Sequence, residues 1–544
     1  MHGAFASAET NLVDCRKNYS FYFDLNEKEL VSPNPPLHRI CTLMRKMGVE
    51  ALLREELVLS NELNEERDAY AIRIGSAINT SARAVRFTFF RRMPASGDWK
   101  ELCDDDIMGY AVILTLKSKG DIRSYVYEAV VRPPSLYIAG KWRTVSNYYV
   151  HCSKVFETTV GTISSQRKFT FLGTFFCQQN GLTHICAHAA LRIALNNWPT
   201  YVGKKITSKI INDALGIDHT ADKQIPDGGL NAQDIQRVVQ KLGHQVFTAE
   251  FIDNPGVDYD EFVYPLIESS CPVVLGIVKK PDIAHVVAVL GHTLNSDRWA
   301  DARHTYGAFP RYPYIPTASW VDHFIFSDDN FGMYMTLPTE GIRNLLVPKH
   351  NPNLHAAIAV GLTPLAGKIS GYLAEQMAAT IGNNIIISTV AAPSNRWLTH
   401  LQIRDSPRNG IGDGQLINPI VCRTLMCAKT QYVALMTQAV DERNYKLNPG
   451  EIELLNKTLP DRFWVTEITI ANLYSGNKRK LGDIITIINP TDPEWNAQEY
   501  NIFAWLTGIC WHGPRLKNGP VNWSIKGHIP LIRGIPLQEC ENEW

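Results

Sequence analysis

Apolar positions in the first third of the chain predict one helix followed by several strands. Apolar side chains recur at helical spacing between residues 37 and 59. Strand-like runs follow at residues 84–90, 110–114 and 125–131. Pro133 and Pro134 then indicate a turn or linker. We therefore expect residues 1–160 to form an N-terminal α+β accessory domain.

The middle of the chain has a helical first half and a strand-rich second half. Helical patterns cover residues 184–197, 206–215 and 231–242. Strand patterns cover residues 246–249, 273–278, 285–290 and 324–327. We expect residues 161–345 to form a second α+β domain with a cleft between these two halves.

The last third of the chain shows its clearest apolar patterns as strands. They cover residues 464–470, 484–488 and 501–505. A short helix is expected at residues 372–379, ended by Gly382, and residues 410–414 are rich in turn-forming glycine. We expect residues 346–544 to form a C-terminal β-rich accessory domain.

Composition and charge place the chain among ordinary globular proteins. It has 544 residues, 45% of them hydrophobic and 20% charged, which is enough for about three domains. Lys plus Arg and Asp plus Glu each total 54, so the formal net charge is zero. This balance gives no general attraction to nucleic acid or to an anionic membrane, and we expect neither as a partner.

Cysteine usage and the apolar stretches suggest a cytoplasmic protein. The eleven cysteines are irregularly spaced and form no CxxC pair, a pattern typical of reduced thiols. The first residues have neither the basic nor the apolar region of a secretory signal. The longest apolar stretch begins at Ala356 and is interrupted by Pro364, Gly367 and Lys368, so no membrane span is expected.

Cys186 is the residue with the strongest chemical signal. A polar, amide-rich loop leads to it, and an Ala/Leu-rich helical stretch follows. A thiol at the start of a helix lies near unpaired backbone N–H groups that stabilise a thiolate, the reactive form. His285 opens a later strand, and Asp328 ends another. The three side chains have the chemistry of a nucleophile, a base and an orienting carboxylate.

Alternatives exist for each partner of Cys186. The amide that stabilises an oxyanion is Gln178, Gln179 or Asn180, and we favour Gln179. His292 and His323 are alternative bases, and Asp329 is an alternative to Asp328. His184 and His188 have the i, i+4 spacing of a zinc pair, yet no third ligand is indicated, so we expect no metal.

These residues resemble the papain-like cysteine peptidases, and most closely the bacterial bacteriocin-processing branch. The similarity lies in a Gln-containing loop, the pattern Cys-x-x-x-Ala-Leu from Cys186 to Leu191, and His-x-Val-x-x-x-Gly from His285 to Gly291. It covers roughly residues 165–340. Asn180 replaces the glutamine that many members have six residues before the cysteine, and Asp328-Asp329-Asn330 replaces the usual Asp-Pro.

The resemblance implies a papain-like catalytic domain at residues 161–345, flanked by the two accessory domains. Its expected activity is hydrolysis of peptide or isopeptide bonds by Cys186, His285 and Asp328, with Gln179 at the oxyanion and no cofactor. A protein or peptide is the expected substrate, and the flanking domains are candidates for binding a protein partner. A thiol acyltransferase or transglutaminase-like enzyme is the alternative, and an inactive binding module is a third possibility.

Overall fold

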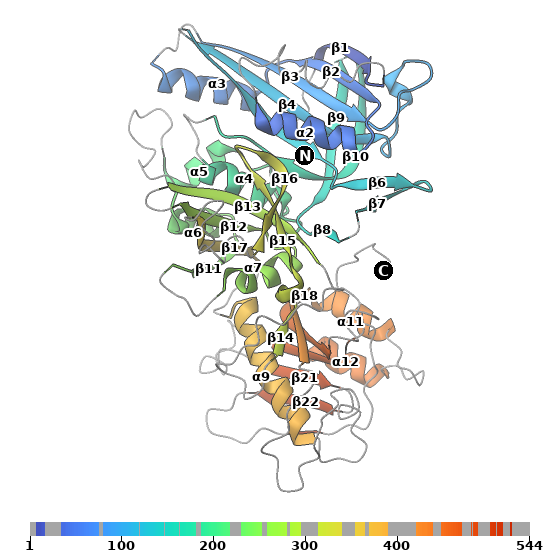
Figure 1. The fold of residues 1–544 in the computed structure, drawn as a ribbon, viewed down its shortest axis with the longest axis vertical. Helices are drawn as coiled ribbons and strands as arrows, with labels where there is room; N and C mark the ends of the chain where they lie inside the picture. The colour runs from blue at the N-terminus through green and yellow to red at the C-terminus, as the bar shows by residue number, and fades with distance from the viewer. Residues whose placement is uncertain are drawn as a thin grey trace.

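The computed structural model shows an α+β protein built from three successive layers of sheet (Figure 1). It describes residues 7–16, 34–75, 80–118, 120–145, 147–162, 164–180, 186–217, 230–252, 258–279, 283–294, 314–339, 354–364, 369–389, 420–438, 448–470, 480, 482–487, 501–506, 509–514 and 523–524. No helix within these ranges is both long and apolar enough to cross a membrane.

The first layer is a closed barrel at one end of the molecule. Its strands, in spatial order, are β1 (Ser7–Asp14), β2 (Ala51–Leu57), β3 (Ser81–Phe90), β4 (Ile107–Ser118), β5 (Asp121–Val131), β10 (Ser165–Phe176) and β9 (Lys154–Thr162). Helices α2 (Pro35–Lys46) and α3 (Asn61–Arg73) accompany the barrel (Figure 1). Arg86 and Glu55 form a buried ion pair between β3 and β2, with Nε and Oε2 2.7 Å apart.

The helix expected over residues 37–59 is wrong in its second half. Helix α2 ends at Lys46, and residues 51–57 form β2. Gly48 adopts a φ of 81°, which breaks the helix. Leu52 and Leu53 fit the helical spacing, but both are buried in the barrel through pairing with β1 and β3, a long-range effect that local periodicity does not contain.

The second layer is an antiparallel sheet covered by helices. Its sheet order is β11 (Gln245–Glu250), β17 (Leu354–Thr363), β12 (Val273–Lys279), β13 (Ile283–Thr293), β15 (His323–Asp328) and β16 (Gly332–Pro338), and β8 (Tyr148–Val150) also pairs with β13. The helices are α4 (Cys186–Asn197), α5 (Ser208–Leu215), α6 (Ala232–Lys241) and α7 (Tyr259–Glu268). Helix α4 packs on β13, and α7 contacts β17 and β13.

The third layer is a sheet accompanied, within the described ranges, by three helices. Its strand order is β14 (Tyr314–Pro316), β18 (Ile420–Ala428), β19 (Arg462–Ile470), β20 (Gly482–Ile487), β21 (Asn501–Leu506), β22 (Ile509–Pro514) and β23 (Trp523–Ser524). The helices are α9 (Gly371–Thr389), α11 (Lys429–Gln438) and α12 (Pro449–Thr458). The expected end of a helix at Gly382 is wrong, because α9 continues through it. An added Cβ there would lie 3.2 Å from Ile484, so glycine permits close packing.

Strand pairing crosses both of the expected domain boundaries. The boundary at residue 160 lies inside β9, and β10 extends the barrel to Phe176. Strand β17 joins the second sheet although it follows residue 345, and β14 joins the third sheet although it precedes that residue. The expected boundaries rested on local composition, which carries no information on these long-range pairs. Residues 410–414 lie outside the described part.

Candidate active site

Cys186 is the first residue of α4 and is only partly buried. The rest of this helix is buried, from Ala187 to Asn197. The Ala-rich sequence allows close packing of α4 against β13 and β15. The helix therefore fixes the thiol at the edge of the core, with its sulfur near the surface of the sheet that carries His285.

His285 and Asp328 form a direct contact in the second sheet. His285 Nε2 lies 3.0 Å from Asp328 Oδ2. The antiparallel pairing of Ala288 with Ser327 brings the beginning of β13 to the end of β15, where these two residues lie. Asp328 Oδ1 accepts hydrogen bonds from the backbone N–H groups of Asn330, at 2.8 Å, and Phe331, at 3.3 Å. The turn after β15 thus holds the carboxylate toward the imidazole.

The thiol of Cys186 also interacts with the imidazole of His285, so one ring connects the thiol and the carboxylate. Burial alone would lower the pKa of His285, but the hydrogen bonds to Asp328 and Cys186 and the charges of Asp328 and Asp329 raise it to about 10. The ring is therefore protonated at neutral pH.

Asp329 also lies close to the imidazole of His285, but unlike Asp328 it forms no hydrogen bond with it. Its Oδ1 is 3.7 Å from His285 Nε2, and its side chain is only 1% exposed. Neither carboxylate oxygen has a hydrogen-bond partner among the described residues. Burial raises the pKa of Asp329 to about 6, although the charge of His285 opposes this. The geometry favours Asp328 as the residue that orients the ring.

Gln178 is fixed to the barrel rather than directed to the thiol. Its Oε1 accepts hydrogen bonds from Asn34 Nδ2, at 2.7 Å, and from the Val126 N–H, at 3.0 Å. Its own backbone N–H donates to the Val126 carbonyl. These bonds continue the pairing of β10 with β5 and anchor the start of the loop that leads to Cys186.

Asn180 is also held by the barrel. Its Nδ2 donates to Glu66 Oε1 at 2.7 Å, and Glu66 Oε1 also accepts from the Tyr125 hydroxyl at 2.7 Å. The Asn180 carbonyl accepts from Arg123 Nη1 at 3.1 Å. This support depends on α3, which contains Glu66 and has no clear apolar pattern in the sequence.

Gln179 is the amide of the three that faces the second sheet. Its Nε2 lies 3.4 Å from Oδ1 of Asn330, in the turn that follows Asp328. The structure thus places Gln179 on the side of His285 and Asp328, and leaves Gln178 and Asn180 on the barrel side. Residues 181–185, which include His184, lie outside the described part.

The alternative histidines lie away from Cys186. His292 is at the other end of β13 from His285, and its Nε2 is 2.7 Å from Glu268 Oε2. His323 begins β15, whereas Asp328 ends it. His188 is buried in α4, where its Nε2 lies 2.8 Å from Asn212 Oδ1. None of these three belongs to the group around the thiol.

A metal ion is a chemical possibility for part of this site. Each of His285, Asp328 and Asp329 offers one ligand atom, and these three atoms lie within 4.8 Å of one another. The interaction of His285 with Cys186 also allows the group to act as a thiol, imidazole and carboxylate without an ion. Comparison of the chain with protein-family models, curated proteins and solved structures found no match.

Proposed function

We propose that the protein is a cysteine peptidase that hydrolyses peptide or isopeptide bonds with Cys186, His285 and Asp328. The observation that supports this most directly is the meeting of these side chains. They come from α4, β13 and the end of β15. His285 Nε2 lies 3.0 Å from Asp328 Oδ2, and the ring also interacts with Cys186. A partly exposed thiol beside a protonated imidazole can lose its proton to become a nucleophile.

The reaction follows from these positions. The Cys186 thiolate attacks the carbonyl carbon, a C–S bond forms, and the carbonyl oxygen becomes an oxyanion. The C–N bond then breaks, and the His285 imidazolium gives its proton to the leaving amine. Water attacks the resulting thioester while His285 takes a proton from it, and loss of the thiolate releases the carboxylic acid. Asp328 keeps the ring oriented throughout.

Gln179 is the proposed side-chain donor to the oxyanion. An amide group has two N–H donors, so a contact with Asn330 leaves a second donor for the developing charge. The backbone N–H of Cys186 supplies the other. Donors of this kind typically contribute roughly 3–4 kcal/mol to stabilising the transition state.

The proposed architecture is a papain-like catalytic unit. A helix that begins at the cysteine packs against an antiparallel sheet that contributes the histidine and the carboxylate, which supports this proposal. The barrel holds the loop before the cysteine, so it would act as a scaffold for the site as well as a candidate partner-binding unit. The nine cysteines whose side chains the structure describes are free thiols, which fits the proposed cytoplasmic location.

An acyl-transfer enzyme with the same residues is the alternative. In that case an amine, rather than water, attacks the thioester. A thiol-directed electrophile such as iodoacetamide is expected to label Cys186 in a Cys103→Ser background, which removes another exposed thiol. Labelling should be much slower in the His285→Ala variant, because the imidazolium that stabilises the thiolate is gone.

Substrate assays complete the test. Incubation with peptide and isopeptide libraries should release free carboxylic acids, and an added primary amine should not appear in the products. Incorporation of the amine would favour acyl transfer. Absence of both selective labelling and turnover would exclude catalysis and leave the inactive binding module.

A further inference from the structure

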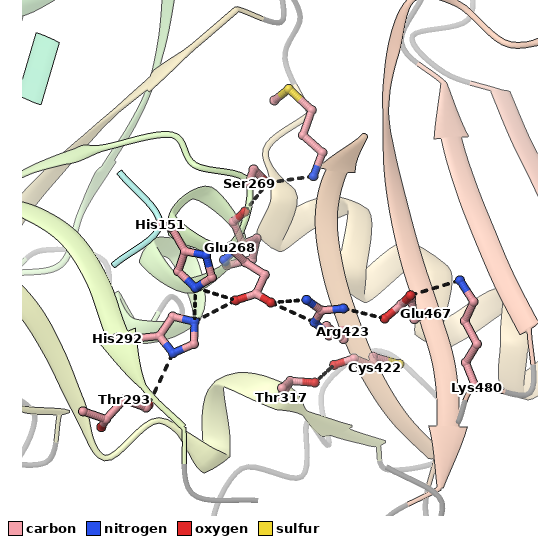
Figure 2. Close-up of polar contacts among 12 residues, drawn as sticks. His151, Glu268, Ser269, His292, Thr293, Thr317, Cys422, Arg423, Glu467 and Lys480 are labelled. Atoms are coloured by element: carbon pink, nitrogen blue, oxygen red, sulfur yellow. Dashed lines mark hydrogen bonds and ion pairs between the residues drawn. The ribbon is translucent and has the colours of Figure 1, made fainter. Parts of the chain in front are cut away.

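A second group of titratable side chains lies where the second and third layers meet, apart from Cys186. It consists of His151, directly after β8, Glu268, the last residue of α7, and His292 in β13 (Figure 2). His151 Nε2 lies 3.1 Å from His292 Nε2 and 3.4 Å from Glu268 Oε2, and the latter is 2.7 Å from His292 Nε2. The three side chains are at most 6% exposed.

The hydrogen bonds of His292 indicate which of its ring nitrogens can act as a metal ligand. His292 Nδ1 lies 3.3 Å from the Thr293 carbonyl oxygen, which can only accept, so Nδ1 carries the proton. In a neutral ring, Nε2 then presents a lone pair to a carboxylate oxygen and to the second imidazole nitrogen. Three such groups this close together in a buried environment need a proton or a metal ion between them to be stable.

The carboxylate of Glu268 forms an ion pair with Arg423 on the side away from the histidines. Arg423 in β18 donates from Nε to Glu268 Oε1 at 2.9 Å, and from Nη2 to the same oxygen. Arg423 Nη1 continues to Glu467 Oε2 at 2.8 Å, as Figure 2 shows. The ion pair with Arg423 occupies Oε1 of Glu268, and Oε2 faces the two histidines.

We propose that His151, His292 and Glu268 bind a divalent transition-metal ion, with Zn²⁺ as the best fit. Zn²⁺ binds imidazole nitrogen and carboxylate oxygen at about 2.0–2.2 Å, which separates tetrahedral ligands by about 3.3 Å. The separations of 3.1 and 3.4 Å to His151 are close to that value, and the 2.7 Å between His292 and Glu268 would lengthen when the ion replaces their hydrogen bond. Water would supply the fourth ligand.

The other hydrogen bonds of the proposed ligands also match those found around metal sites. A bound imidazole usually donates its other N–H to a carbonyl, as His292 does to Thr293, and a bound carboxylate is usually hydrogen-bonded, as Glu268 is to Arg423. The ion would connect β8, α7 and β13, and through Arg423 the third sheet. Its role would be to hold the layers together, independently of the proposed peptidase activity.

Zinc binding to the purified full chain tests this inference. The protein is treated with a chelator, dialysed and titrated with ZnCl₂, and bound metal is measured by elemental analysis together with the thermal unfolding midpoint. We expect about one tightly bound ion per chain and a midpoint that rises with zinc, since a ligand that binds only the folded state stabilises it. The His292→Ala variant should lose more than the roughly 10–100-fold in affinity typical of outer contacts.

Two further variants separate this site from the candidate active site and from unfolding. His285→Ala should retain the ion, and the exposed His38→Ala should behave as wild type. His151→Gln provides a second ligand variant, with folding checked by circular dichroism, in case His292→Ala does not fold. Zinc lost in His285→Ala and kept in the ligand variants would overturn the proposal. So would a wild-type chain that binds no zinc, which would indicate a purely hydrogen-bonded cluster.

Discussion

His285 Nε2 lies 3.0 Å from Oδ2 of Asp328, although 43 positions separate the two residues in the chain. The contact forms because β13 and β15 are antiparallel neighbours and the two residues occupy adjoining strand ends. This carboxylate and the Cys186 hydrogen bond together overcome the effect of burial on the imidazole and keep it protonated.

The pH dependence of activity should reflect that contact. The active form proposed here needs a protonated His285, whose pKa is raised to about 10, so kcat/KM should fall only as the pH rises through that value. In Asp328→Asn the negative charge is lost, the pKa of His285 falls, and the basic limb of the profile should move to lower pH. Residual turnover is expected because an amide can still accept from the ring.

Asp329→Asn serves as the matched comparison for that profile. Asp329 is farther from the imidazole, so its variant should shift the basic limb less and stay closer to wild-type rates at neutral pH. A larger loss in Asp329→Asn than in Asp328→Asn would mean that the orienting carboxylate has been misassigned.

Replacement of the nucleophile should separate activity from folding. Cys186→Ser is expected to reduce kcat/KM by at least roughly 1,000-fold, because a hydroxyl is a much weaker nucleophile beside an imidazolium. The thermal midpoint should change little, since the side chain is only partly buried and similar in size. His285→Ala should be equally inactive and His323→Ala active. Turnover by Cys186→Ser at the wild-type rate would refute the cysteine mechanism.

The two neighbouring glutamines should respond differently to substitution. Gln179→Ala is expected to lower kcat by roughly 100-fold, the usual cost of an oxyanion donor, with little effect on stability. Gln178→Ala should lower the free energy of unfolding instead, because it removes the acceptor of Asn34 and of the Val126 N–H. Steady-state kinetics and urea unfolding of both variants distinguish these outcomes. Equal kcat values in the two variants would contradict the assignment of Gln179.

Arg423 should be important for stability although it is far from the thiol. It lies between Glu268 and Glu467, so Arg423→Met leaves two buried carboxylates without this partner and is expected to cost about 3–5 kcal/mol. Lys429→Met is the control. Its Nζ lies 3.5 Å from Oδ1 of Asp461, whose side chain is 99% exposed. Such an exposed ion pair contributes at most about 1 kcal/mol to the free energy of unfolding. Urea unfolding should show this contrast, and a small loss for Arg423→Met would contradict it.

The sequence revealed the members of the candidate site better than it revealed their surroundings. Cys186, His285 and Asp328 each lie at the end of an element, and the start of a helix or the limits of an apolar run can be recognised locally. The sequence favours Gln179 but leaves Gln178 and Asn180 as alternatives, because it does not show what holds each side chain. Gln178 and Asn180 are held by hydrogen bonds to the barrel, which join residues far apart in the chain.

The fold shows the same division between local and long-range information. The strands expected at residues 273–278 and 464–470 match β12 and β19 closely, because the first is a continuous apolar run and the second is rich in β-branched residues. Strand β2 was mistaken for helix, and the places of β8, β14 and β17 in their sheets were not foreseen. The group formed by His151, Glu268 and His292 likewise depends on three separate elements and has no spacing pattern that identifies it.

The position of β17 also limits the order in which the nascent chain can assemble. This strand lies between β11 and β12, yet it is made well after both of them. At roughly 5–20 residues per second, the ribosome needs several seconds or more to synthesise the intervening chain. Until then β11 and β12 each present an edge that only β17 fills, and such open edges pair readily with other chains. A chain that ends before Leu354 would keep those edges permanently, even though it contains Cys186, His285 and Asp328.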